Sequence, residues 1–254
     1  MEYLISKFLF CPPQKRFDVN RFEDDPTTSL VQCVEDEHTV YMARVQCVDA
    51  PTSYILYAHG NSEDIQLLKN FLKHLSIQYN SVVYAVEYTG YGPTLGGPAP
   101  SMEACYRDVL TASTHLNRTE TLPRVLWGRS MGCAPAMRAA STHGYSTCII
   151  IESAFLTPLM TFIPFHLPFE TMFENIYEIE RVDPTIPILF IHGARDRVVP
   201  VSHGKRLYEL CRSIHKSIHV LSKAGHNDIH NRENRGEVET MIQLFIKNFT
   251  STHS

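Results

Sequence analysis

The sequence lacks several features that mark particular classes of protein. It has no apolar run long enough to span a bilayer, and neither a Cys-x-x-Cys nor a His-Glu-x-x-His motif. Its seven cysteines are odd in number and widely spaced, unlike a disulfide framework or a zinc site. We therefore expect free thiols in a cytoplasmic chain that needs no metal and no cofactor.

An excess of positive charge is also missing. The chain has 23 basic and 27 acidic residues, a formal net charge of −4 and no basic stripe. Phosphate groups would not be neutralised by such a surface, so we expect no nucleic-acid partner. The apolar residues near the N-terminus (Leu4, Ile5, Phe8 and Phe10) are too few to span a bilayer. We expect them to pack on the protein body, and weak contact with a membrane surface is the alternative.

Short apolar runs alternate with stretches of helical periodicity, which is typical of a parallel sheet built from βαβ units. We expect one α/β domain over residues 1–254, with a mostly parallel, twisted sheet and helices on both faces. The predicted strands are Thr39–Cys47, Tyr54–Ala58, Val82–Val86, Arg124–Trp127, Cys148–Ile151, Ile188–Ile191 and Ser217–Leu221. The predicted helices are Glu63–Ile77, Ser101–Leu116, Met131–His143, Ser202–Cys211 and Gly236–Phe249.

Two regions fall outside this alternation. Residues 1–35 are expected to form an N-terminal arm. The segment Thr157–Asp183 mixes prolines with phenylalanines and fits neither a helix nor a strand, so we expect it to form a cap above the carboxyl edge of the sheet.

The strongest motif is Gly128-Arg129-Ser130-Met131-Gly132, which lies between a predicted strand and a predicted helix. This is the context of a nucleophile elbow, where the serine sits on a sharp turn and side chains at the flanking glycines would collide with the backbone. The following helix N-terminus favours the negative charge that develops during attack. The motif predicts Ser130 as a nucleophile.

A serine hydroxyl needs a base to remove its proton, and in this fold the acid and the histidine follow the serine along the chain. Asp196 and His226 lie in loops after predicted strands, at the sheet edge where such sites occur. Asp183 precedes its strand, and Asp228 is too close to the histidine in sequence, so both are weaker candidates for the acid. The pattern predicts an α/β-hydrolase with Ser130, Asp196 and His226 as its triad. The remaining histidines, His192, His203 and His230 among them, are expected to have surface or structural roles.

Acyl transfer also requires two backbone N–H groups that face the developing oxyanion. Met131, directly after the nucleophile, is one candidate donor. The second is Asn61, in the loop Tyr57-Ala58-His59-Gly60-Asn61 after an earlier strand. We expect His59 to anchor this loop and not to touch the substrate.

Several linked stretches of the chain resemble a known family. These are Tyr57–Asn61, Tyr88–Gly92, Gly128–Gly132, Ser202–Gly204 with Leu207–Glu209, and Ala224-Gly225-His226-Asn227-Asp228-Ile229. Together they are similar to α/β-hydrolase-domain-containing protein 17, a family of protein depalmitoylases, from Ser53 to the C-terminus. The resemblance implies the same triad and a palmitoylated protein as substrate.

The chain departs from that family at three places. Arg129 stands where the family has glutamine, and Glu87 where aspartate is usual. Only Cys11 lies near the terminus, where family members carry a cluster of cysteines that become palmitoylated. Because one acyl chain gives only marginal membrane binding, this sequence does not predict stable anchoring.

The leading hypothesis is therefore an esterase or thioesterase that forms an acyl-enzyme on Ser130, with an acyl ester or an acylated protein as substrate. The cap residues Phe162, Phe165 and Phe169 are expected to line the acyl site, or else to pack the cap onto the body. The same triad also serves serine peptidases and lipid esterases, and a scaffold that has lost catalysis is the non-enzymatic alternative. The sequence does not predict an oligomeric state.

Overall fold

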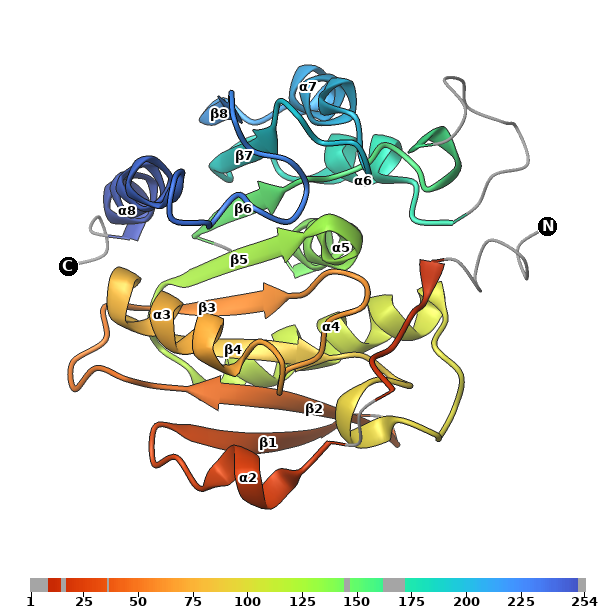
Figure 1. Cartoon of the computed structure of the whole chain (residues 1–254), viewed down its shortest axis with the longest axis vertical. Helices are drawn as coiled ribbons and strands as arrows, with labels where there is room; N and C mark the ends of the chain where they lie inside the picture. The colour runs from red at the N-terminus through yellow and green to blue at the C-terminus, as the bar shows by residue number, and fades with distance from the viewer. Residues whose placement is uncertain (1–8, 15–16, 36, 144–146, 162–171, 251–254) are drawn as a thin grey trace.

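One continuous sheet runs through the computed structural model, which describes residues 9–14, 17–35, 37–143, 147–161 and 172–250 (Figure 1). Its strands are β1 (Thr28–Glu35), β2 (His38–Val45), β3 (Ser53–Ala58), β4 (Ser81–Glu87), β5 (Arg124–Arg129), β6 (Cys148–Glu152), β7 (Ile188–Gly193) and β8 (Lys216–Leu221). Their order across the sheet is β1-β2-β4-β3-β5-β6-β7-β8. β2 pairs antiparallel with β1 and β4, and the other pairs are parallel.

Helices cover both faces of this sheet (Figure 1). They are α2 (Val19–Glu23), α3 (Lys69–Tyr79), α4 (Met102–Thr119), α5 (Cys133–His143), α6 (Asn175–Arg181), α7 (Val201–Leu210) and α8 (Arg235–Thr250), with short 3₁₀ turns η1 (Gly92–Thr94), η2 (Ser130–Gly132) and η3 (Leu159–Thr161). α2, α3 and α8 share one apolar cluster, and α4 to α7 share the other. No helix within the described ranges combines the length and apolar character needed to cross a bilayer.

The two clusters explain why the central strands are apolar throughout. Along β3, Tyr54 and Leu56 belong to one cluster, whereas Ile55 and Tyr57 belong to the other. Successive side chains of a strand point to opposite faces, so a strand covered on both faces buries every residue. The expected architecture, a mostly parallel sheet between two helical layers, is confirmed.

All seven predicted strands are present, within two residues at either end. The structure adds elements in the two regions that fell outside the pattern. Residues 1–35, expected to form an arm, include α2 and the edge strand β1. The expected cap segment contains η3 and a short helix, α6, whose Ile179 is fully buried.

The strand order creates a place for a site. β4 lies on one side of β3 and β5 on the other, so the chain reverses its direction across the sheet at this point. In open α/β sheets a crevice forms beyond the carboxyl ends of the strands at such a reversal. Those ends lead directly into His59–Asn61 after β3 and into Ser130 after β5.

Candidate active site

Ser130 occupies the turn between β5 and η2, in backbone geometry that is unfavourable for a residue with a side chain. Its φ angle is 51°, in the left-handed region. A Cβ on Gly128 would lie 2.6 Å from Cys133 Cα and 2.7 Å from Gly132 O, and one on Gly132 would collide with the backbone of Ala58 and His59. Gly128 and Gly132 are therefore required for this close approach of backbone segments, as predicted from the motif.

The structure brings Ser130, His226 and Asp196 into one hydrogen-bonded chain. Ser130 Oγ lies 3.1 Å from His226 Nε2, and His226 Nδ1 lies 2.7 Å from Asp196 Oδ2. Asp196 comes from the loop after β7 and His226 from the loop after β8. With the Nδ1 proton held by Asp196, Nε2 is the ring nitrogen that can accept the serine proton.

Asp196 is held in its ionised form by donors on both carboxylate oxygens. The N–H groups of Val198 and Val199 donate to Oδ1 at 2.8 and 2.7 Å, and His192 Nε2 lies 3.4 Å from Oδ2. Burial alone would raise the pKa of Asp196, but the hydrogen bonds from His192, His226 and Val199 outweigh it and hold the pKa below its ordinary value.

The competing acids make other contacts. Asp228 accepts a hydrogen bond from the backbone N–H of Gly225 at 2.5 Å, and Asp183 accepts from the backbone and hydroxyl of Thr185. In the described part of the chain neither carboxylate forms a hydrogen bond or ion pair with the His226 ring, so Asp196 is the acid that the geometry favours.

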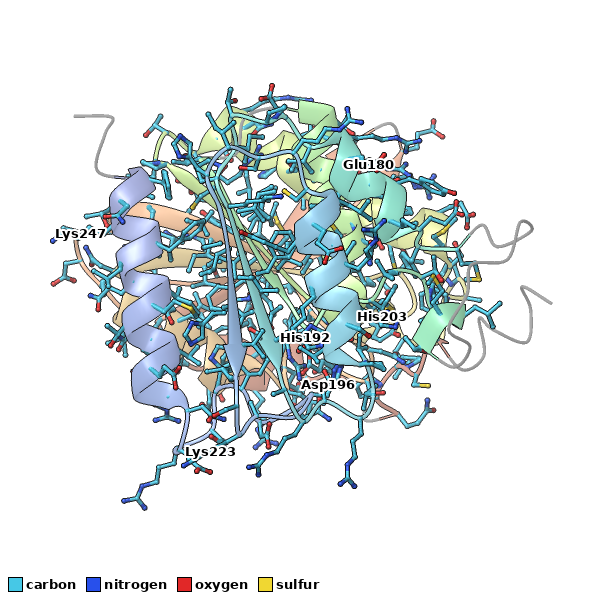
Figure 2. The ribbon with its side chains drawn as sticks, turned by 90° about the horizontal axis from the view of Figure 1, so that it is seen from above. Glu180, His192, Asp196, His203, Lys223 and Lys247 are labelled. Carbon is cyan, nitrogen blue, oxygen red and sulfur yellow. The ribbon has the colours of Figure 1, made fainter. Side chains whose placement is uncertain are left out.

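The other buried histidines hold loops in place. His192 lies 2.9 Å from Val199 O, and the backbone N–H of Leu156 donates to His203 Nδ1 at 3.1 Å. Figure 2 shows His192, Asp196 and His203 grouped beside α7. His59 is fully buried between Gly60 O and Glu87, which agrees with the anchoring role expected for it. Burial lowers the pKa of His203, which favours the neutral ring that accepts this bond.

Asn61 and Met131, the expected oxyanion-hole residues, line the same cavity as Ser130. The Asn61 side chain is held by three donors, namely the backbone N–H groups of Ser62 and Cys11, at 2.9 and 2.8 Å, and the Tyr91 hydroxyl at 3.1 Å. These bonds fix the loop whose backbone would face the oxyanion.

A cleft of about 770 Å³ opens over Ser130 and His226. Its apolar lining comes from distant parts of the chain: Leu9, Met131, Phe155, Pro158, Leu159, Val198 and Val199. Phe162, Phe165 and Phe169 lie outside the described residues, so their expected place in an acyl site stays a prediction. Phe10 is buried and its ring centroid lies 6.0 Å from that of Phe173, so this part of the N-terminal segment packs on the body, as expected.

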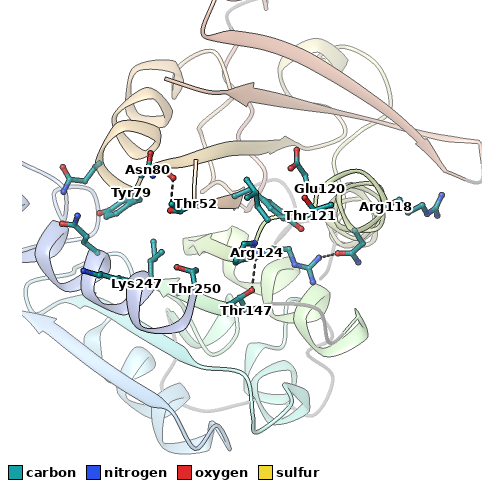
Figure 3. A pocket seen from close by; sticks show the side chains of 17 residues that line it. Thr52, Tyr79, Asn80, Arg118, Glu120, Thr121, Arg124, Thr147, Lys247 and Thr250 are labelled. Carbon is teal, nitrogen blue, oxygen red and sulfur yellow. Dashed lines mark hydrogen bonds between the residues drawn. The ribbon is translucent and has the colours of Figure 1, made fainter. Parts of the chain in front are cut away.

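A larger hollow, of about 1140 Å³, lies at the opposite edge of the sheet (Figure 3). Its walls come from the loops that precede β3 to β6, the first residues of β3 and β5, the ends of α3 and α4, and α8. They include Thr52, Asn80, Arg124, Thr147 and Lys247. The lining contains neither a histidine nor a cysteine that could activate or replace a serine nucleophile. The smaller cleft over Ser130 is therefore the candidate active site. Within the described ranges, no group of three His, Cys, Asp or Glu side chains could hold a metal ion.

Sequence reasoning missed several residues of the cleft. Leu9 lies in the N-terminal segment, for which we expected packing on the body or weak membrane contact, and neither Phe155 nor Val199 was a candidate site residue. The sequence identifies Arg129 as a departure from the family pattern but does not predict that its side chain joins loops around Ser130.

Comparisons with known proteins agree with this fold. The family model Hydrolase_4, described as "Serine aminopeptidase, S33", matches residues 49–178. The chain is 29% identical to alpha/beta hydrolase domain-containing protein aho-3 of Caenorhabditis elegans, over 89% of this chain and 73% of that protein. It is 32% identical to alpha/beta hydrolase domain-containing protein 17C of Xenopus tropicalis, over 73% of this chain but only 59% of that relative.

Among solved structures, an esterase of Pyrococcus furiosus, Pf2001, superposes with a TM-score of 0.75 at 15% identity, over 95% of this chain and 98% of that one. At that identity the likeness shows the fold alone. The strand order, the elbow at Ser130 and the family match together assign the chain: it is a hydrolase with the α/β-hydrolase fold and belongs to the Hydrolase_4 family.

Proposed function

We infer that the chain hydrolyses acyl esters or thioesters through a covalent acyl-enzyme on Ser130. The observation that carries this proposal is the Ser130–His226–Asp196 hydrogen-bonded chain at the base of an apolar cleft. Catalysis by such a triad needs a nucleophile, a base and an orienting acid within hydrogen-bond reach, and the three groups meet that condition.

The reaction proceeds in two halves. Ser130 Oγ attacks the acyl carbon while His226 Nε2 takes the hydroxyl proton, and the N–H groups of Met131 and Asn61 stabilise the oxyanion. His226 then returns the proton to the departing alcohol or thiol. Water repeats the sequence on the acyl-enzyme, which releases the acid and frees Ser130.

The finer proposal is that the acyl group is long and is carried on a protein cysteine. The apolar lining of the cleft supports a long chain, because each methylene removed from water contributes about 0.8 kcal/mol. The resemblance to α/β-hydrolase-domain-containing protein 17 supports a palmitoylated protein. An aminopeptidase activity is the second candidate, because the matched family model carries that description.

The first test is Ser130→Ala, assayed with a fluorophosphonate probe and with matched thioester, oxygen-ester and peptide-amide substrates. We expect no labelling and no hydrolysis, at a nearly unchanged melting temperature, because the substitution removes one half-buried hydroxyl oxygen and no core volume. Ser141→Ala is the matched control, since that serine lies in α5 and, among the described residues, its hydroxyl bonds only to the Arg138 carbonyl of its own helix. If the fluorophosphonate probe still labelled Ser130→Ala, the assignment of Ser130 as the nucleophile would be wrong. Turnover of the amide alone would favour the peptidase, and folded wild-type protein that never reacts would be a scaffold.

A further inference from the structure

Beside the nucleophile, the Arg129 side chain is almost completely buried between two carboxylates. Its exposed fraction is 12%. Nη1 forms an ion pair and hydrogen bond with Glu63, and Nε lies 3.3 Å from Glu152 Oε1. Burial alone would lower the pKa of Arg129, but Glu63 and Glu152 outweigh this effect and raise the pKa above its ordinary value. The guanidinium therefore stays charged.

The third nitrogen of Arg129 reaches the loop that carries the histidine. Nη2 donates to the backbone carbonyl of His226 at 3.3 Å and to Asn227 Oδ1 at 2.9 Å. Arg129 is the residue directly before Ser130, so one guanidinium joins the base to the turn that carries the nucleophile.

Glu63 extends this connection to the loop after β3. While one of its oxygens bonds to Arg129, the other accepts the backbone N–H of Gly60 at 2.9 Å. Gly60 directly precedes Asn61, the expected oxyanion donor. The Arg129–Glu63 pair thus links the three loops that would bring nucleophile, base and oxyanion donor together.

Glu152 is the second carboxylate beside Arg129. It is fully buried at the end of β6, and His230 Nε2 lies 2.8 Å from its other oxygen. Burial would raise the pKa of Glu152, but His230 and Arg129 outweigh it and hold the pKa below its ordinary value. The two carboxylates neutralise the positive charge of the Arg129 guanidinium, so it would not attract a substrate anion. Its contacts favour a role in holding the loops.

We propose that Arg129 is a positioning residue which, through Glu63 and His226, sets the spacing of Ser130, the general base and the oxyanion loop. The proposal rests on the triad function above. An arginine is needed because its planar guanidinium carries five N–H donors in fixed directions. Here it donates hydrogen bonds to Glu63, the His226 carbonyl and Asn227, and it also forms an ion pair with Glu152. A glutamine amide has two donors and no charge, and a lysine ammonium cannot span these acceptors.

The test uses Arg129→Gln, Arg129→Lys, Arg129→Ala and Glu63→Gln in the full chain, assayed on one acyl thioester. Because small misplacements of catalytic groups slow chemistry, we expect kcat to fall by about 10- to 100-fold with KM nearly unchanged. Fluorophosphonate labelling should slow by the same factor. The double variant Arg129→Gln/Glu63→Gln should lose no more than Arg129→Gln alone, since both changes break the same link.

Chemical rescue separates positioning from a general structural effect. A cavity of about 140 Å³ lies beside Arg129, Glu63 and Glu152, so guanidinium ion should enter the space left in Arg129→Ala and restore part of kcat. Sodium at the same ionic strength should not. Arg206→Ala is the matched control, because that arginine lies on α7 and its one ion pair within the described part of the chain is with Glu209 at the surface. Its activity should match wild type with or without guanidinium.

Each outcome decides between the two proposals. Activity in Ser130→Ala would overturn the proposed function itself. An inactive Ser130→Ala beside Arg129→Gln and Arg129→Lys within twofold of wild type would overturn the positioning role alone. If Arg129→Ala does not fold, Arg129→Lys and Glu63→Gln carry the test. A fall in kcat that tracks a lower melting temperature, with no rescue in any folded variant, would assign Arg129 to stability only.

Discussion

Asp196 and Asp228 lie near the same histidine and provide a matched pair of substitutions. Asp196 accepts from the His226 ring, whereas Asp228 accepts from a backbone N–H. Asp196→Asn should lower kcat by about 10⁴-fold, because the amide favours the wrong ring tautomer. Asp228→Asn should retain most of the activity. Steady-state kinetics of both variants checks the assignment, and the reverse ranking would make Asp228 the functional acid.

The hydrogen bonds of Asp196 also have a consequence for stability. A carboxyl group whose pKa is depressed in the folded state stabilises the fold above its unfolded pKa, about 3.9, and this contribution is lost as pH falls through the folded pKa. Asp196→Asn should therefore melt below wild type at pH 7, and the gap should narrow below about pH 4. Thermal melts from pH 7 to pH 3 measure this difference, and a gap independent of pH would contradict it.

For single residues, the sequence predicts which side chains meet only where the fold fixes their position along the chain. Ser130, Asp196 and His226 follow parallel strands, so the topology places them along one sheet edge, and the structure brings them within hydrogen-bond distance. Arg129 could not be interpreted this way. Its contacts depend on where a long side chain points, and no spacing rule relates it to Glu63, 66 residues earlier.

Gly128 lies at the tight turn that connects β5 to α5, and its substitution tests that turn. Gly128→Ala should destabilise the fold by about 1–3 kcal/mol or more, because its Cβ would overlap Cys133 and Gly132. Gly236→Ala in α8 is the control. Its Cβ would meet nothing within 4 Å, and alanine is favoured over glycine in a helix by about 1 kcal/mol. Denaturant titration of both variants should give changes of opposite sign.

The elements that the sequence missed have weak signals for physical reasons. β1 is an edge strand with mixed burial and polar residues such as Gln32 and Glu35, so it lacks the continuous apolar run of the central strands. α6 spans seven residues after a proline-rich stretch. Its Ile179 is buried by tertiary packing, which local periodicity does not report.

The cleft as a whole depends on residues from Leu9 to Asn227, so its shape is a property of the folded molecule. Catalytic efficiency (kcat/KM) should rise with acyl length until the apolar wall ends, at about 0.8 kcal/mol for each buried methylene. Assays on thioesters of increasing length measure this slope. A flat profile would mean that the acyl chain remains in water.

The cap prediction is tested by the same series of substrates. If Phe162, Phe165 and Phe169 line the acyl site, replacing each with alanine should reduce kcat/KM for long chains and spare short ones. Phe249→Ala is the control, because that ring packs on Phe245 in the apolar cluster that α3 and α8 share, away from the residues that line the cleft. Equal losses on all chain lengths, together with a lower melting temperature, would show that the cap phenylalanines are structural.

Ser130 has a left-handed backbone conformation, so a substitution that stabilises the fold at this position would also remove the proposed activity. A side chain in that region costs about 1–2 kcal/mol that glycine does not incur. Ser130→Gly should therefore relax the turn and raise the melting temperature while it removes the proposed nucleophile. A search for heat-resistant variants that scored survival of the fold alone would enrich an inactive protein, so it must score turnover in the same round.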